Sequence, residues 1–414
     1  MKKILLLCTV IMFTALVSCS SGKDDGKIRV IGTWGGSELE TFQAMADAAG
    51  IEIEFETTRD LNAILTAKAG KDGPYDMAIL PNPAMLSQLA KDGKLAELSY
   101  LNRKNLAKEF GNSLIRLGSY GGKLYGVYIK ASNKSVIWYN PEEFEKNGWK
   151  VPETWNELIS LTDQIRSAGK TPWSIGADIG WPTTDWIENI MVGSAGEDTY
   201  QQWVDHSIKW NDPAVKEAFI LWGQIVGNKA NLLGGIDGTL SSKFQDASYA
   251  LFQKNPKAFL YYEGDFMGGI VKGQIPSVEF GKNMDFFAFP KIKDKSCVVG
   301  GADVIVAFND RKKVKDFIKK LSSVEIQTVA AKKGFMAANK LVDPAVYPDK
   351  TLQKSASILA AADVFVFDAS DLMPPAVGNQ GGFWDKSKEF IKKPEDIDRI
   401  LDEMEILAAK NYGN

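Results

Sequence analysis

Short apolar runs alternate with amphipathic stretches along the first ninety or so residues that follow the N-terminal segment. Residues 27–32, 51–55 and 75–80 are apolar or strictly alternating, and this pattern predicts strands. Each is followed by apolar residues at helical spacing, with helices beginning near Ser37, Asp60 and Ala84. Strands and helices in this order predict a wound α/β unit, in which ligands gather at loops beyond the strand ends.

The rest of the chain predicts a second unit. Residues 125–129 and 135–139 are strand-like and lead into a helix-rich region over residues 155–252, with a further strand at 259–265. A strand at 304–308 and helices between 312 and 333 return to the first unit, and a charged helix closes the chain. A chain of 414 residues is long for a single core, which also favours two lobes.

We expect residues 27–132 and 296–342 to form lobe 1, and residues 133–295 and 343–414 to form lobe 2. The chain leaves the first lobe at one segment and returns at another, so a hinge is expected near residues 129–134 and 287–291.

The N-terminal segment predicts export. Lys2 and Lys3 precede an apolar run over residues 4–17, which is too short to span a bilayer and is typical of a signal peptide, here residues 1–18. Ser18 followed by Cys19 resembles a bacterial lipobox, in which the cysteine is lipidated; a signal peptide with a chance cysteine is the alternative. Residues 19–26 are polar and predict a tether. The expected location is outside the cytoplasm, anchored by lipid at the periplasmic or cell-surface side.

Composition narrows the chemistry. A net charge of −3 and a pI near 5.6 do not favour nucleic acid or an anionic lipid surface, so the lipid on Cys19 is the expected membrane contact. Cys8 leaves with the signal and Cys19 carries lipid, so Cys297 has no partner for a disulfide. His206 is the single histidine, which argues against a His-rich zinc site, and we expect neither metal nor cofactor.

Aromatic residues point to a ligand class. The chain has 11 Trp, 12 Tyr and 21 Phe, and several Trp lie beside Gly, Asp or Glu, as in residues 32–36 and 180–188. A sugar packs its C–H face on an indole and donates hydroxyl hydrogens to carboxylates, so this pattern favours a saccharide. The alternative is that large aromatic side chains only fill the core.

Eight motifs, spread over the chain after the signal, carry a family resemblance: residues 32–38, 58–62, 76–83, 152–155, 172–176, 180–188, 300–303 and 370–374. In these the chain resembles extracytoplasmic solute-binding lipoproteins of ABC sugar importers, the α-glucoside and oligosaccharide type of the bacterial extracellular solute-binding protein family 1. The resemblance implies a two-lobed α/β periplasmic-binding-protein fold (type II) with a ligand cleft between the lobes. It further implies a monomer that captures a neutral saccharide, such as a di- or oligosaccharide α-glucoside, and delivers it to permease subunits.

The chain departs from the family pattern in two places. Phe266 stands where many relatives have a sugar-stacking Trp, and the loop expected after Trp181 is compact. Both departures bear on the choice of sugar.

Twelve residues are candidate ligand contacts, and they are Trp34, Glu38, Arg59, Asp60, Asn82, Trp181, Asp185, Trp186, Glu263, Asp265, Phe266 and Asp303. Some have structural alternatives. Glu38 could only favour a helix start, Asp60 could only cap a helix, and Asp303 could only form a turn.

Two other functions are alternatives to sugar transport. A secreted glycosidase needs two carboxylates at a fixed separation across the scissile bond, and the spacing of acids in this chain singles out no such pair, so we expect no enzyme. A sensor or adhesin lipoprotein stays open, because a lipid anchor and two lobes would serve it equally well.

Overall fold

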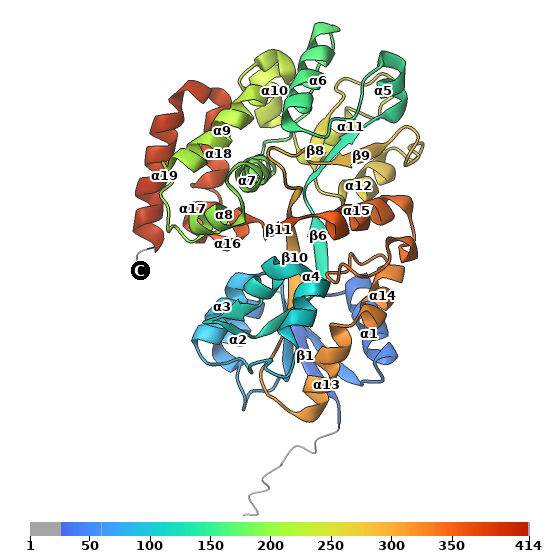
Figure 1. The fold of residues 1–414 in the computed structure, drawn as a ribbon, viewed down its shortest axis with the longest axis vertical. Helices are drawn as coiled ribbons and strands as arrows, with labels where there is room; N and C mark the ends of the chain where they lie inside the picture. Colours follow the sequence, from blue (N-terminus) through green and yellow to red (C-terminus); the bar gives the residue numbers. More distant parts are fainter. Residues whose placement is uncertain (1–25, 59, 413–414) are drawn as a thin grey trace, which may run out of the picture.

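The computed structural model describes residues 26–58 and 60–412, which fold into two lobes (Figure 1). The predicted signal peptide, Cys19, nearly all of the tether and Arg59 lie outside the described residues. The described chain begins at the far end of lobe 1, whereas its last helix belongs to lobe 2, so the two ends of the described chain lie in different lobes (Figure 1).

Lobe 1 is built on a mixed sheet with the strand order β11-β10-β3-β1-β2, and β6 also pairs with β10. β1 runs parallel to β2 and β3, whereas β10 runs antiparallel to β3 and β6. Central β3 is apolar and buried throughout, as expected for a strand covered on both faces. The strands are β1 (Ile28–Gly32), β2 (Ile53–Thr57), β3 (Met77–Leu80), β6 (Gly126–Asn133), β10 (Cys297–Ala307) and β11 (Val364–Phe367).

The helices of lobe 1 bury one apolar stripe each against this sheet. Phe42, Leu65, Leu86 and Phe317 are fully enclosed in a core shared with the strands. The elements are α1 (Ser37–Ala48), α2 (Leu61–Lys68), α3 (Pro83–Lys91), α4 (Arg103–Leu117), β4 (Ser119–Tyr120), β5 (Lys123–Leu124), α13 (Lys312–Leu321) and α14 (Val324–Lys332). The predicted βαβ order and the return of the helices after residue 312 are confirmed.

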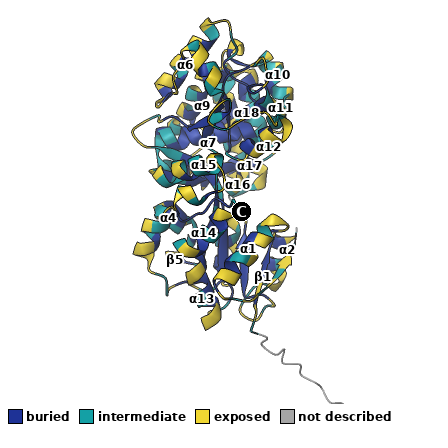
Figure 2. Cartoon of the chain, turned by 90° about the vertical axis from the view of Figure 1, so that its right-hand side faces the viewer, coloured by how far each residue is buried: buried dark blue, intermediate teal, exposed yellow. Residues whose placement is uncertain are grey.

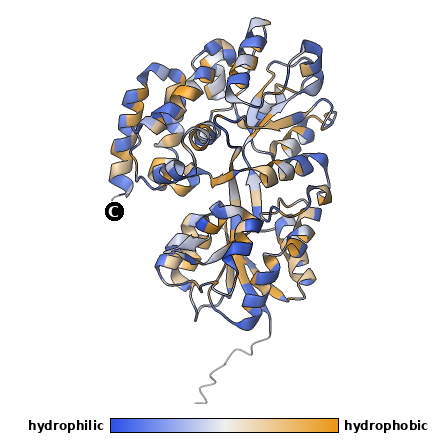
Figure 3. Cartoon of the chain, in the orientation of Figure 1, coloured by the Kyte–Doolittle hydropathy of each residue, from blue (hydrophilic) through white to orange (hydrophobic). Residues whose placement is uncertain are grey.

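Lobe 2 has a small antiparallel sheet of order β8-β7-β9, namely β8 (Tyr261–Glu263), β7 (Val136–Tyr139) and β9 (Asp285–Ala288). Helices surround it, and the long α7 is almost entirely buried (Figure 2). Closing helix α19 carries hydrophilic and hydrophobic residues on opposite faces (Figure 3).

The helices that follow β7 in the chain begin with α5 (Pro141–Asn147), α6 (Trp155–Ser167), α7 (Trp181–Ala195), α8 (Glu197–Val204), α9 (Pro213–Val226), α10 (Gly235–Ser241), α11 (Phe244–Tyr249) and α12 (Met267–Gln274). After α14 the chain forms α15 (Lys350–Ala361), then β11, then α16 (Ala369–Leu372), α17 (Pro375–Gly378), α18 (Phe383–Lys392) and α19 (Ile397–Tyr412). Short 3₁₀ turns occur at Lys229–Asn231, Pro344–Val346 and Pro394–Asp396.

The lobes are joined by strands that pair with each other. Asn133 at the end of β6 pairs with Gly300 of β10, and the backbone N–H of Lys134 donates to Val299 at 3.0 Å. The expectation of a second hinge segment at residues 287–291 is wrong, because Phe287 lies inside β9 and pairs with Ile137. The chain returns along β10 instead.

A second correction concerns Trp181. The expected compact loop after this residue is helix α7, which begins at Trp181 itself after Gly180 adopts a positive φ of 92°. No helix among residues 26–58 and 60–412 is long and apolar enough to cross a membrane.

Candidate functional site

The first half of the site forms around Lys130 at the edge of lobe 1. Its Nζ lies 2.5 Å from Glu38 Oε1 and 3.8 Å from Asp303 Oδ2. It also sits 5.7 Å from the centre of the Trp34 ring and 5.0 Å from that of Phe335. A cation over aromatic faces gains from the ring quadrupole, so the lysine is held by both charge and π contacts.

Local structure explains this arrangement. Asp303 is the cross-strand partner of Lys130, and a β-bulge between Asp303 and Val304 changes the register there. Bulges of this kind redirect side chains near functional sites. Burial raises the pKa of Asp303 to about 6, and Lys130 opposes that rise.

The second half of the site forms around Lys134, just after β6. Its ammonium group pairs closely with Asp368 at the end of β11 and lies 3.4 Å from Asp185 Oδ1 on α7. The same ammonium lies 5.1 Å from the centre of the Trp181 ring. Residues far apart in sequence therefore build a second lysine, carboxylate and indole group.

Further carboxyl groups surround this ion pair. Glu188, one turn after Asp185, accepts hydrogen bonds from the backbone N–H groups of Ala369 (2.9 Å) and Ser370 (3.2 Å). One oxygen of Asp185 and one of Glu263 are buried without a hydrogen-bond partner. Such atoms are costly to bury as charged acceptors, which favours the protonated form.

The protonation pattern follows from burial and from Lys134. Burial raises the pKa of Asp185 and of Glu188 well above the usual range, and burial also raises the pKa of Glu263 to about 8. For Asp368 burial acts in the same direction, but Lys134 outweighs it and lowers the pKa. The cluster thus holds one ion pair together with acids whose raised pKa values favour the protonated form, in which a carboxyl group can donate a hydrogen bond.

The carboxylates of Asp185, Glu188 and Asp368 offer oxygens within 4.8 Å of one another, close enough to share a cation. Lys134 supplies that cation from the protein itself. The donor set therefore fits an internal ammonium group.

We call the groups around Lys130 and Lys134 the two half-sites, and one extended segment, β6 with the residue after it, links them. Lys130 and Lys134 are four residues apart, so their side chains share one face of an extended chain. At about 3.3 Å per residue their Cα atoms are roughly 13 Å apart. The strand that crosses between the lobes therefore carries the central cation of both half-sites.

Aromatic surface is available beside Lys134. The Phe266 ring is 6.4 Å from that of Trp181, and Phe266 is 39% exposed. Trp34 is only 2% exposed, because its ring meets those of Phe42 and Phe335 edge-on.

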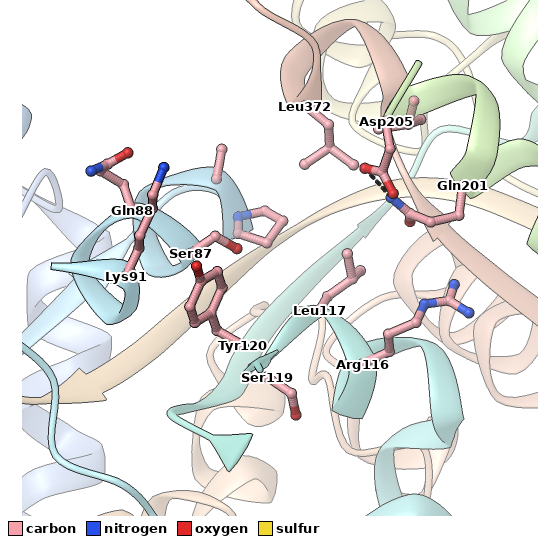
Figure 4. A pocket seen from close by; sticks show the side chains of 13 residues that line it. Ser87, Gln88, Lys91, Arg116, Leu117, Ser119, Tyr120, Gln201, Asp205 and Leu372 are labelled. Atoms are coloured by element: carbon pink, nitrogen blue, oxygen red, sulfur yellow. Dashed lines mark hydrogen bonds between the residues drawn. The ribbon is translucent and has the colours of Figure 1, made fainter. Parts of the chain in front are cut away.

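A separate cavity of about 430 Å³ lies between the lobes (Figure 4), and its lining includes none of the residues named above around Lys130 or Lys134. Ser87, Gln88 and Tyr120 line it from lobe 1, and Gln201 and Leu372 line it from lobe 2. Its wall includes Pro83 and Leu372, which directly follow Asn82 and Asp371 in the chain.

Several candidates from the sequence do not join either half-site. Asn82 caps α3 by accepting a hydrogen bond from the Met85 N–H at 3.1 Å. Asp60 is exposed and precedes α2 without a side-chain capping bond. Asp265 accepts a hydrogen bond from Ser355 at 2.6 Å.

Trp186 lies in the core of lobe 2. It is 1% exposed, and its ring packs 4.5 Å from Tyr262 and 5.0 Å from Trp173. Its indole therefore presents no open face to a ligand in this structure.

Sequence reasoning missed Lys130, Lys134, Glu188, Phe335 and Asp368. One signal was available for the lysines: four residues apart on a strand expected to cross between lobes, they must share a face. Asp368 directly follows an apolar run at 364–367, the same strand-end position that singled out other candidates.

Two lobes joined by paired strands, with polar and aromatic groups gathered where they meet, define a two-lobed solute-binding protein. Residues 35–328 match the sequence model of the bacterial extracellular solute-binding protein family, and the chain belongs to that family. The resemblance drawn from the sequence motifs is thereby confirmed.

Relatives and solved structures agree with this assignment. The chain is 33% identical over 409 residues to the osmoprotective compounds-binding protein GgtB of Synechocystis, covering 94% of this chain and 96% of that protein. It is 31% identical to the alpha-glucosides-binding periplasmic protein AglE of Rhizobium meliloti, covering 88% and 83%. The solute receptor AcbH shares the fold with a TM-score of 0.78 at 18% identity, covering 94% of this chain and 99% of that chain.

Proposed function

We propose that this protein captures a small neutral saccharide between its lobes and delivers it to the permease of an ABC importer. The observation that carries the proposal is the pair of half-sites around Lys130 and Lys134 on one crossing strand. The names of GgtB and AglE, relatives over most of the chain, support an osmoprotective compound or an α-glucoside as ligand.

The charges of the site support a neutral ligand. Lys130 is compensated by Glu38, and Lys134 is compensated by Asp368. Protonated Asp185 and Glu263 add donors without adding charge. An uncharged polyol can exchange hydrogen bonds with such groups and rest a C–H face on Trp181 or Phe266, whereas a charged ligand would leave one charge unpaired.

Titration calorimetry with a panel of glucosyl-polyols, trehalose, maltose, sucrose and maltotriose tests the ligand class. At least one should bind with an affinity that changes little between 50 and 500 mM salt, because no net charge is neutralised. Binding that weakens steeply with salt, or no binding to any of these sugars, would contradict the proposal.

The proposed role is binding without hydrolysis. Asp185 and Asp368 have pKa values shifted in opposite directions, but both face Lys134, which occupies the position between them. Incubating the purified protein with each sugar that binds should release no monosaccharide, and release that is lost in Asp185→Asn would establish a glycosidase instead.

Lipid anchoring at Cys19 is part of the proposal and places the monomer outside the cytoplasm. Cys19→Ala should abolish acylation and signal removal at that residue. The measurement is mass spectrometry of the mature N-terminus with membrane fractionation, and unchanged processing would show that Cys19 is not the lipid acceptor.

A further inference from the structure

Helix α13 carries a strongly basic face. Residues 310–321 hold six basic and two acidic side chains, a net charge of +4 in a chain whose net charge is −3. Lys312, Lys313, Lys319 and Lys320 are exposed. The small negative net charge of the whole chain therefore conceals a local positive surface on α13.

The opposite face of α13 is fixed in the core. Val314, Phe317, Ile318 and Leu321 are fully buried, so the helix cannot turn its apolar face toward another partner without unfolding lobe 1. Ion pairs within the helix region, such as Lys312 with Asp316 at 2.5 Å, leave the excess of positive charge in place. Any partner of this face is recognised by charge.

The position of α13 relative to the chain start identifies the partner. The described chain begins at the same end of lobe 1 as α13 (Figure 1), and a Cβ placed on Gly26 would be 3.6 Å from Lys313 Nζ. Between Cys19 and Gly26 the extended chain reaches at most about 25 Å. A lipid on Cys19 would therefore hold the basic face close to the membrane.

We infer that the basic face of α13 rests on anionic phospholipid headgroups of the membrane that carries the anchor. This inference rests on the proposed lipidation of Cys19. Lysines near an anionic leaflet are attracted to it over roughly one screening length, about 10 Å at 0.1 M salt. Lobe 1 then lies next to the membrane and lobe 2 points away from it, so the basic face adds a second membrane contact to the expected lipid.

Energy transfer to the membrane tests the orientation. The lipidated full-length protein, with Cys297→Ser, carries a donor dye on Ser99→Cys beside α13 or on Ser167→Cys in lobe 2. It is reconstituted in vesicles of phosphatidylcholine alone or with 30% phosphatidylglycerol and an acceptor-labelled lipid. On anionic vesicles the Ser99 dye should transfer at least twofold more efficiently than it does on neutral vesicles, whereas transfer from the Ser167 dye should change little, and 500 mM salt should remove the gain.

A charge variant and its matched control make the test specific. Lys312→Gln/Lys313→Gln/Lys319→Gln should reduce transfer from the Ser99 dye to the level seen on neutral vesicles. Lys146→Gln/Lys150→Gln/Lys254→Gln, which removes the same charge from exposed positions of lobe 2, should leave it unchanged. Circular dichroism and the melting temperature verify that both variants are folded.

The outcomes separate this inference from the anchor. Vesicle flotation first reports whether the protein is attached: attachment with equal transfer on both vesicle types overturns the inference and leaves the anchor standing. If the protein does not attach through lipid, it should still float with anionic vesicles at low salt, and the α13 variant should not. That result supports binding by the basic face alone. If the parent protein does not float with anionic vesicles, the inference is overturned. Unchanged transfer combined with impaired sugar uptake in cells carrying the α13 variant would assign the face to the permease, which also overturns it.

Discussion

Lys134 of the crossing segment and Asp368 at the end of β11 form a close ion pair across 234 residues of sequence. Both groups are largely enclosed, with side-chain exposures of 17% and 2%. The pair joins the end of β6, which leads into lobe 2, to the end of β11. The Lys134 ammonium group therefore belongs both to the connection between the lobes and to the proposed ligand site.

Removing Lys134 should cost both stability and binding. In Lys134→Met the Asp368 carboxylate stays buried without its cation, and losing one member of a buried pair costs about 3–5 kcal/mol. Urea denaturation should show this loss, and calorimetry should show no sugar binding. Lys134→Met/Asp368→Asn should recover most of the stability but not the binding; a double variant as unstable as the single one would mean that the pair is not the cause.

Stability should fall as pH rises from about 4.5 to 8. Burial raises the pKa of Glu263 to about 8, so the folded protein holds this proton more tightly than the unfolded chain does. An acid whose pKa is higher in the folded than in the unfolded protein stabilises the fold fully at pH values below its unfolded pKa. This contribution is lost as the pH rises through its folded pKa. The measurement is the melting temperature from pH 4.5 to 8.5.

Glu263→Gln is the matched variant for this pH dependence, since it keeps the shape of the protonated acid. Its melting temperature should vary less with pH over the same window. An identical slope in the variant and the parent protein would assign the pH dependence to other groups.

The two tryptophans of α7 should respond differently to truncation. Trp181→Ala should lower sugar affinity about tenfold, because the proposed sugar face loses its packing on this half-buried ring, and a loss of about 1.4 kcal/mol is tenfold in affinity. Trp186→Ala should instead destabilise the protein by about 3–5 kcal/mol, because its ring is enclosed in the core of lobe 2. Calorimetry and thermal denaturation of both variants distinguish these effects, and an affinity unchanged by Trp181→Ala would remove this ring from the site.

Ligand should favour a closed arrangement of the lobes. A ligand shifts such an equilibrium only by its different affinity for the two states, and we expect a sugar held between the lobes to make more contacts as the lobes approach. Small-angle scattering with and without a bound sugar should therefore show a smaller radius of gyration. A constant radius would mean that binding occurs without closure.

The sequence predicted the local parts of this molecule well. The wound order of lobe 1 follows from strand ends and glycine loops, which are local features. Trp34, Glu38 and Asp303 were chosen from the same features, and they gather around Lys130; their contact with ligand stays a prediction. The aromatic content was also informative, but Trp181 and Trp186 have the same local pattern and different surroundings.

What the sequence did not reveal depends on contacts across the fold. Nothing local distinguishes Lys134 from other lysines, because its partners come from α7 and from β11. The hinge prediction at residues 287–291 failed for a related reason: an apolar run shows that a strand forms, but not which neighbour it pairs with.

The separation of the chain ends has a practical use. Gly26 belongs to lobe 1 and α19 belongs to lobe 2, so the ends of the folded body follow the two lobes independently (Figure 1). A pair of fluorescent proteins fused at these ends would convert lobe movement into a ratio of two colours. Because its two ends lie in different lobes, the protein could serve as the receptor part of a genetically encoded sugar biosensor.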